Sequence, residues 1–255
     1  MSLIDHHTSP ATWSHNFSSP TPTIGPAQGP PRYQHTPNYT PPDAGLAPIP
    51  PRNEQELTRK ALLKVLDYFS QLVAQHFSGR PIRLVVHGGA CMLLHEGLYK
   101  LSLQQHEMSP NLPRRTTTRD VDYIHRSFVA EMAASGMPDA APRLAECIKG
   151  TARKFGLGLD WMNSQADIAL PYAYEYVPFF VSYNIAPDRT ISPSGKPYDP
   201  IHMASIQQNN IDLHTVYTAP NKILTLISVT PFWAVSLKLS RYVNWDPGDI
   251  CLLLR

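Results

Sequence analysis

The sequence has few cysteines, few charged residues and almost no net charge. Of its 255 residues 3 are cysteines and 16% are charged, and the formal net charge is +2 at pH 7. The cysteines are far apart and form no Cys-x-x-Cys pair, which argues against a disulfide framework or a zinc knuckle and favours a reducing compartment. A balanced charge neither requires nor excludes a nucleic-acid partner.

The sequence also lacks the usual features of export and membrane insertion. Its first residues, MSLIDHHTSP, contain no basic segment followed by an apolar one, so they do not resemble a secretory signal. The most apolar window, 223–239, is interrupted by Ser, Thr, Pro and Lys and is too short to span a bilayer. We therefore expect a cytoplasmic protein with no membrane partner, and a nuclear location stays open.

Proline is distributed unevenly along the chain. Of the 26 prolines, 12 precede Asn53, in a stretch with only four charged residues and no periodic apolar pattern. Such a composition cannot bury a core, so residues 1–52 are predicted to be a disordered Pro/Ser/Thr-rich tail. Residues 53–255 are predicted to form one domain, with a helical C-terminal part at about 218–255. Because the last apolar run has no stop signal, we expect its helix to be cut short or only just completed.

The pattern of apolar residues predicts alternating helices and strands after the tail. The segment IRLVV is typical of a buried strand, and TTTRDVDYI is typical of a strand with Asp120 and Asp122 on one face. These two strands span residues 82–86 and 116–124. A further strand is predicted at 177–183, and a strand or short helix before Pro231. Helices are predicted at 53–77, 90–101, 127–134 and 143–154 and from Pro231, with a polar loop at 102–115.

Gly88 and Gly89 follow the first of these strands directly. A Gly-Gly pair at a strand-to-helix turn lets the backbone adopt conformations closed to other residues, and it brings amide groups close to an anion such as a triphosphate. Tight strand-to-helix turns use glycine in many folds, so a purely structural role is equally open.

Asp120 and Asp122 are the second feature with a chemical interpretation. Two carboxylates at a strand end can hold Mg²⁺ or Mn²⁺ and leave coordination positions for substrate phosphates. The alternative is a solvated strand end without a ligand. If the two strands are neighbours in a sheet, the glycine turn and the carboxylates meet at one cleft.

The succession RLVVHGGACMLL and RRTTTRDVDYI resembles the nucleotidyltransferase fold, in particular minimal enzymes related to the AbiEii-type toxin nucleotidyltransferases. The resemblance spans about residues 80–255. It continues at 159–163 (LDWMN), at Lys238 within LKL, and at the Asp246-x-x-Asp249 element. It implies an α+β (α/β) domain with a small mixed sheet flanked by helices and a helical C-terminal portion.

The resemblance also implies an activity, the metal-dependent transfer of a nucleotide from a nucleoside triphosphate to a protein or RNA acceptor. In that role Asp120 and Asp122 ligate Mg²⁺ (or Mn²⁺), and Lys238 and Asp249 are further catalytic residues. The implied nucleotide-binding residues are Gly88, Gly89, Thr118 and Arg119.

Several alternatives stay open. A third carboxylate, which many members of the family carry on a later strand, has two candidates, Asp160 and Asp167. Lys238 can equally be a lysine of an amphipathic helix, and Asp249 can serve the dipole of the last helix. The domain can also be a catalytically inactive binding or regulatory module, or an Asp-x-Asp glycosyltransferase that uses a nucleotide sugar.

Overall fold

The computed structural model describes residues 48–108, 114–168, 170, 173–174, 197–241 and 245–255. The predicted strand at 177–183 and all but the last five residues of the predicted tail lie outside these ranges. Ala47–Arg255 form one compact unit. No helix in the described ranges is long and apolar enough to cross a membrane.

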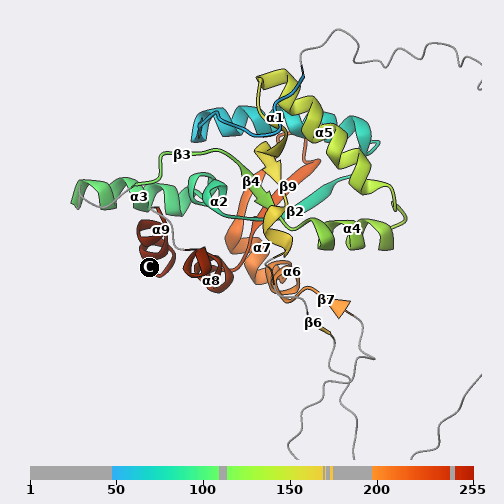
Figure 1. The fold of residues 1–255 in the computed structure, drawn as a ribbon. Coiled ribbons are helices and arrows are strands. Elements are labelled where there is room, and N and C mark those ends of the chain that lie inside the picture. Colours follow the sequence, from blue (N-terminus) through green and yellow to red (C-terminus); the bar gives the residue numbers. More distant parts are fainter. Residues whose placement is uncertain (1–47, 109–113, 169, 171–172, 175–196, 242–244) are drawn as a thin grey trace, which may run out of the picture. The chain divides into compact units, whose positions relative to one another are not determined.

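A five-stranded mixed sheet forms the centre of the domain, in the order β5-β4-β2-β9-β8 (Figure 1). Its strands are β2 (Ile82–His87), β4 (Val121–Tyr123), β5 (Met162–Asn163), β8 (Thr215–Thr218) and β9 (Leu224–Ser228). The central strand β2 runs parallel to β9 and antiparallel to β4, and five of its six residues are buried. The predicted fold class, an α+β domain with a small mixed sheet flanked by helices, is confirmed.

Two long helices, α1 (Arg59–His76) and α5 (Ala140–Phe155), pack against each other on one face of this sheet (Figure 1). Leu84 and Val86 of β2 point into the same core, as the alternation of side chains along a strand requires. Helix α1 begins six residues later than the predicted Asn53. The reason is that Leu57–Thr58 form a short strand, β1, which pairs with β3 (Thr117–Thr118), and Thr58 then caps the helix.

The opposite face of the sheet is covered by the C-terminal helices. Val85 of β2 belongs to a second apolar cluster with Ile201, Val229 and, at its edge, Trp233 and Leu237. These residues come from β2, α6 (Pro200–Ser205) and α8 (Pro231–Arg241), with Val229 directly after β9. Helix α8 begins at Pro231 as predicted, because proline has no N–H to lose at the first helical position.

The remaining helices connect these layers. They are α2 (Gly89–Leu94), α3 (Glu96–Met108), α4 (His125–Ala134), α7 (Gln208–His214) and α9 (Asp246–Leu253), with 3₁₀ turns η1 (Leu159–Trp161) and η2 (Gln165–Ile168), and a small pair of strands, β6 (Ala173–Tyr174) and β7 (Pro197–Tyr198). The predicted loop at 102–115 is wrong over its first half, because SLQQHEM continues α3 and holds no helix breaker.

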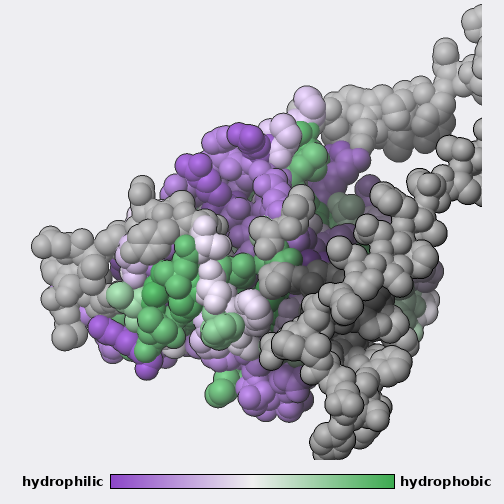
Figure 2. Space-filling view, turned by 60° about the horizontal axis from the view of Figure 1, so that its bottom comes forward, coloured by the Kyte–Doolittle hydropathy of each residue, from purple (hydrophilic) through white to green (hydrophobic). Residues whose placement is uncertain are grey.

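Helices α8 and α9 leave apolar side chains at the surface. Figure 2 shows a hydrophobic area on the side of the molecule where these helices lie. Among the large apolar side chains of the described residues, Phe232 of α8 and Leu254, which follows α9, are the most exposed, at 70% and 72%. Nothing in the described part of the chain covers them.

The last residues of the predicted tail pack against the domain. Pro50 accepts a hydrogen bond from the N–H of Leu159 (2.8 Å), and Ile49 is half-buried against the main core. The backbone of Arg52 runs so close to Gly158 that a Cβ on that glycine would lie 2.1 Å from the Arg52 carbonyl carbon. Residues 49–52 therefore contribute to the fold.

The packing of residues 49–52 against the domain predicts different outcomes for two truncations. Deletion of residues 1–46 is expected to leave the thermal unfolding midpoint unchanged. Deletion of residues 1–52 is expected to lower the free energy of unfolding by about 1–2 kcal/mol, because it removes the half-buried Ile49 and the bond to Leu159. Thermal melts of the three proteins test this, and equal midpoints for both truncations would contradict it.

Candidate functional site

The glycine turn and Asp122 meet where β2 pairs with β4. The antiparallel register sets His87 opposite Asp122, so the next residue, Gly88, lies beside the carboxylate. Gly88 has φ of 78° and ψ of −153°, a backbone conformation that L side chains rarely adopt. A Cβ there would also lie 2.5 Å from Asp122 Oδ2. Both the backbone angle and the neighbouring carboxylate therefore require glycine at this position.

Gly89 lies against a different pair of side chains. A Cβ on Gly89 would be 2.7 Å from Arg115 Nη1 and 2.8 Å from Thr118 Oγ1. Thr118 is buried and donates its hydroxyl hydrogen to the backbone oxygen of Asp120 (3.1 Å). Thr118 thus shapes the bend that leads to Asp120.

The predicted continuous strand at 116–124 is wrong in its middle. The chain bends at Arg119, so β3 pairs with β1 and only β4 joins the central sheet. Asn53 stabilises the bend, since its side-chain amide donates to the Arg119 carbonyl. Asp122 therefore lies on β4, whereas Asp120 precedes it, and both residues are half-buried.

The two arginines near this bend have different surroundings. Arg119, the predicted nucleotide-binding residue, is exposed, and its guanidinium lies 3.7 Å from Glu56 Oε1. Arg115 is 11% exposed and lies beside Gly89. A guanidinium beside the glycine turn is thus that of Arg115, which the spacing of the motif did not single out.

Lys238 and Asp249 belong to a buried cluster of four charged groups. Lys238 Nζ lies 2.6 Å from Asp249 Oδ2 and 3.3 Å from Asp246 Oδ1. Arg115 also binds Asp249 Oδ2, through Nε at 3.0 Å and Nη2 at 2.9 Å. Two acids and two bases balance each other, which is the condition for burying charges at low cost.

This cluster borders a cavity that also reaches the glycine turn. The cavity measures about 160 Å³, and its lining is mostly apolar. It is lined by His87, Gly88, Ala166, Ala234, Leu237, Lys238 and Ser240. The carboxylate of Asp122 and the ammonium of Lys238 therefore lie near the same hollow, from β4 and α8 respectively.

Cys91, in the first turns of α2, is buried near this cavity but is not a candidate nucleophile. Burial raises the pKa of its thiol to about 12, against the opposing effects of a hydrogen bond with Ser228 and the charge of Lys238. A thiol is nucleophilic only as the thiolate, so Cys91 stays unreactive at neutral pH.

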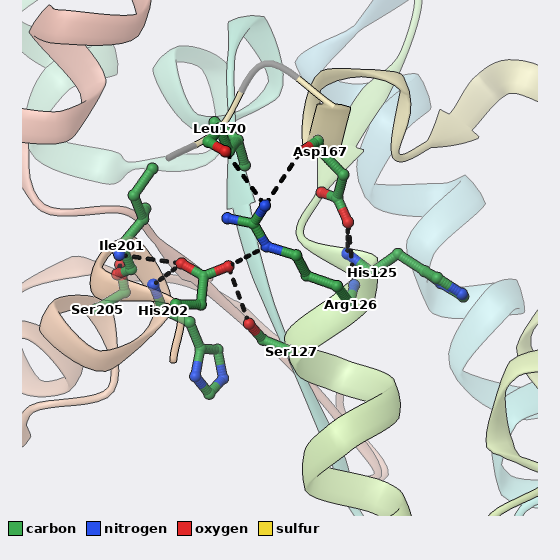
Figure 3. A network of polar contacts seen from close by, with 9 residues as sticks. His125, Arg126, Ser127, Asp167, Leu170, Ile201, His202 and Ser205 are labelled. Carbon is green, nitrogen blue, oxygen red and sulfur yellow. Dashed lines mark hydrogen bonds and ion pairs between the residues drawn. The ribbon is translucent and has the colours of Figure 1, made fainter. Parts of the chain in front are cut away.

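Neither candidate for a third carboxylate joins Asp122. Asp160 accepts a hydrogen bond from the backbone N–H of Asn53. Asp167 Oδ2 accepts from the N–H groups of His125 and Arg126 at the start of α4, both at 3.0 Å (Figure 3). In the described residues no group of three or more His, Cys, Asp or Glu side chains is arranged to hold a metal. The residue in register with Asp122 on the neighbouring strand β5 is Asn163.

A second polar network, which the sequence reasoning missed, holds one wall of the cavity. Arg126 Nε donates to Asp199 Oδ2 (2.6 Å), and Arg126 Nη1 donates to the carbonyl oxygens of Asp167 and Leu170 (Figure 3). It thereby ties α4 to the η2 turn, whose Ala166 lines the cavity. The pair Asp199-Pro200, a cap residue before a first-turn proline, is the sequence feature that would have located α6.

The charge of Asp199 is stabilised by this network. Burial disfavours the charged form, but the hydrogen bond from Arg126 and the backbone N–H of His202 hold the pKa of the carboxyl below its usual range. Asp199 Oδ1 also accepts from the N–H of Ile201 (3.0 Å), so the same side chain caps α6. One carboxylate thus joins the start of α4 to the start of α6.

The fold and the site define an α+β domain in which a glycine turn, the Asp122 carboxylate and a buried lysine lie near one end of a small mixed sheet. Comparison of the chain with protein-family models, with characterised proteins and with solved structures finds no significant match.

Replacing Asp199 by Asn is expected to lower the free energy of unfolding by about 2 kcal/mol at pH 7, because the cap survives while the half-buried guanidinium of Arg126 loses its ion pair with the Asp199 carboxylate. The lowered pKa of Asp199 means that its stabilising effect is full above the ordinary carboxyl pKa of about 4 and is lost as the pH falls through the lowered value. Urea denaturation of both proteins across this pH range measures the difference.

The control is Asp139→Asn, which breaks an exposed i,i+4 pair with Arg143. Exposed pairs contribute little, so this variant should unfold like the unmodified protein. A difference between Asp199→Asn and the unmodified protein that grows as the pH falls would contradict the assigned sign.

Proposed function

We propose that this domain binds a metal-bound nucleoside triphosphate between the glycine turn and Asp120/Asp122, and transfers a nucleotide to a protein or RNA acceptor. An acceptor hydroxyl loses its proton and bonds to the α-phosphorus, and the bond between the α- and β-phosphates breaks to release pyrophosphate. The observation that carries the proposal is the contact between Gly88 and the Asp122 carboxylate at the β2–β4 pair, next to a cavity lined by Lys238. The order of strand, glycine turn, helix and Asp-x-Asp, which resembles the nucleotidyltransferase fold, supports the same function.

The carboxylates suit one hard divalent cation. Mg²⁺ is commonly bound through one or two carboxylates and completes its coordination with water and substrate phosphates. Asp120 and Asp122, two residues apart and both half-buried, would hold Mg²⁺ or Mn²⁺ in this way. The ion would supply charge neutralisation at the phosphate chain.

In the proposed site, different side chains would contact the phosphates and the rest of the nucleotide. Arg115 lies beside Gly89 and offers a guanidinium to phosphate oxygens, for which its planar donors are well suited. The cavity beyond Gly88 is lined mainly by apolar side chains, among them Ala234 and Leu237. Such a lining accepts a flat ring more readily than a charged group.

A second candidate function is nucleotide binding without transfer. It is favoured by Asn163, which is in register with Asp122 on β5, where a third carboxylate would stand beside the pair. An amide oxygen is a neutral and weaker ligand than a carboxylate for a second divalent ion. In this reading the domain is a regulatory module that senses the nucleotide.

The binding test compares the unmodified protein with Asp120→Asn/Asp122→Asn by calorimetry, with Mg²⁺ and each nucleoside triphosphate. The double variant is expected to lose at least about tenfold in affinity, because the metal loses both carboxylates. Asp212→Asn, which changes an exposed acid on α7, is the control and should bind normally. Equal affinity in all three proteins would end both candidate functions.

A transfer assay distinguishes the two candidate functions. With an α-phosphate-labelled triphosphate and Mg²⁺, an active transferase labels an acceptor, and Asp122→Asn abolishes the label. Binding without labelling supports the second candidate, in which case Asn163→Asp tests whether the missing carboxylate is the cause. Labelling from a nucleotide sugar instead would support the glycosyltransferase alternative.

Gly88→Ala is expected to lower nucleotide affinity by at least about tenfold, because its Cβ displaces the Asp122 carboxylate. The matched control is Gly136→Ala. Gly136 has φ of 86°, but a Cβ there meets no atom within 4 Å. Both variants are expected to lose about 1–3 kcal/mol of stability from backbone strain, and only Gly88→Ala should lose binding. Equal affinity of the two variants would show that Asp122 does not take part.

A further inference from the structure

A single carboxylate oxygen, Oδ2 of Asp249, binds both Arg115 and Lys238. Asp249 Oδ2 accepts from Lys238 Nζ at 2.6 Å, from Arg115 Nη2 at 2.9 Å and from Arg115 Nε at 3.0 Å. Three charge-assisted donors around one oxygen are the environment that proteins usually offer to a phosphate oxygen. In this structure the position is taken by a side chain of the protein itself.

The two cations that Asp249 holds are those that border the glycine turn. Arg115 Nη1 lies 2.7 Å from the place of a Cβ on Gly89, and Lys238 lines the cavity together with Gly88. Asp249 is 2% exposed, at the start of α9, and is not among the lining residues. It therefore holds the cations from the buried side, whereas a ligand would reach Lys238 from the cavity.

We propose that Asp249 is an internal substitute for phosphate, which holds Arg115 and Lys238 in place and weakens the binding of phosphate anions at the glycine turn. This rests on the proposed function in assigning a phosphate chain to that turn. The ligand class is a multiply charged phosphate anion, either free polyphosphate or the chain of a nucleotide. Asp249 thus acts as a competing anion and not as a catalytic residue.

The competition follows from the number of donors and from charge. An anion that takes N–H groups of Arg115 or Lys238 either removes them from Asp249 or lies close to its carboxylate, where like charges repel. In both cases the anion binds less tightly than it would to the same cations without Asp249. The advantage for the protein is that two buried cations remain paired when no ligand is bound.

Asp246 provides a matched comparison for the experiment. It is a carboxylate of the same helical turn, it is fully buried, and its Oδ1 lies 3.3 Å from Lys238 Nζ. Asp246→Asn and Asp249→Asn therefore change the net charge by the same amount at similar depth. Only Asp249→Asn removes the oxygen on which Arg115 and Lys238 meet.

The experiment titrates the full chain with sodium tripolyphosphate by calorimetry in metal-free buffer containing EDTA. Asp249→Asn is expected to bind tripolyphosphate at least about tenfold more tightly than the unmodified protein, and Asp246→Asn by less than about threefold. Equal gains in both variants, or no gain in Asp249→Asn with either tripolyphosphate or a nucleoside triphosphate, would overturn the proposal. Because no metal is present, the result is independent of whether Asp120 and Asp122 bind a metal-bound nucleotide.

Two further arms complete the test. If Asp249→Asn is unfolded in plain buffer, refolding it with tripolyphosphate is expected to restore cooperative melting. Sodium chloride at equal ionic strength is not expected to do so. The proposal is overturned if neither salt restores melting, or if both restore it equally. A nucleoside triphosphate titration in the same buffer identifies the source of the anion. A gain with tripolyphosphate shows that free polyphosphate suffices, and a gain with the nucleotide alone shows that the nucleotide chain is the ligand.

Discussion

The pairing of β2 with β4 is the constraint on which the candidate site depends. Its register sets His87 opposite Asp122, so the turn that follows must run directly past a carboxylate. Only a residue without a Cβ can do so at the backbone angles of Gly88. Because β2 is also the buried centre of the sheet, the position of the carboxylate is held by the main core and does not depend on a surface loop.

Two networks of charged side chains lie near the β2–β4 pair, and they connect different elements. Asp249, Lys238, Asp246 and Arg115 join α8 and α9 to the segment before β3, and Lys238 among them lines the cavity. Asp199 and Arg126 join α6 to α4 and to the η2 turn, whose Ala166 lines the cavity. Each network consists of opposite charges at hydrogen-bond distance, so each is costly to break on one side only. The two networks therefore hold α8 and the η2 turn, which both line the cavity, to their neighbouring elements.

Local patterns predicted several elements well. The near-continuous apolar run of β2, the glycine turn after it and the start of α8 at Pro231 each follow from residues adjacent in sequence. The errors have a common origin in contacts between distant segments. Helix α1 starts late because β1 pairs with β3, and the strand around Asp120 is bent because Asn53 binds the Arg119 carbonyl. Neither pairing leaves a periodic pattern in the residues that it changes.

The sequence by itself determined the α+β composition, the glycine turn after β2 and the presence of two acids near a strand end, because propensity and alternation act over a few residues. The tertiary structure decided which charges meet. Arg115 lies at the glycine turn, and Asp249 binds both Arg115 and Lys238. Asp160 and Asp167 accept hydrogen bonds from backbone N–H groups. The sequence does not show whether a carboxylate contacts a ligand or the N-terminus of a helix, because its neighbours are determined by tertiary packing.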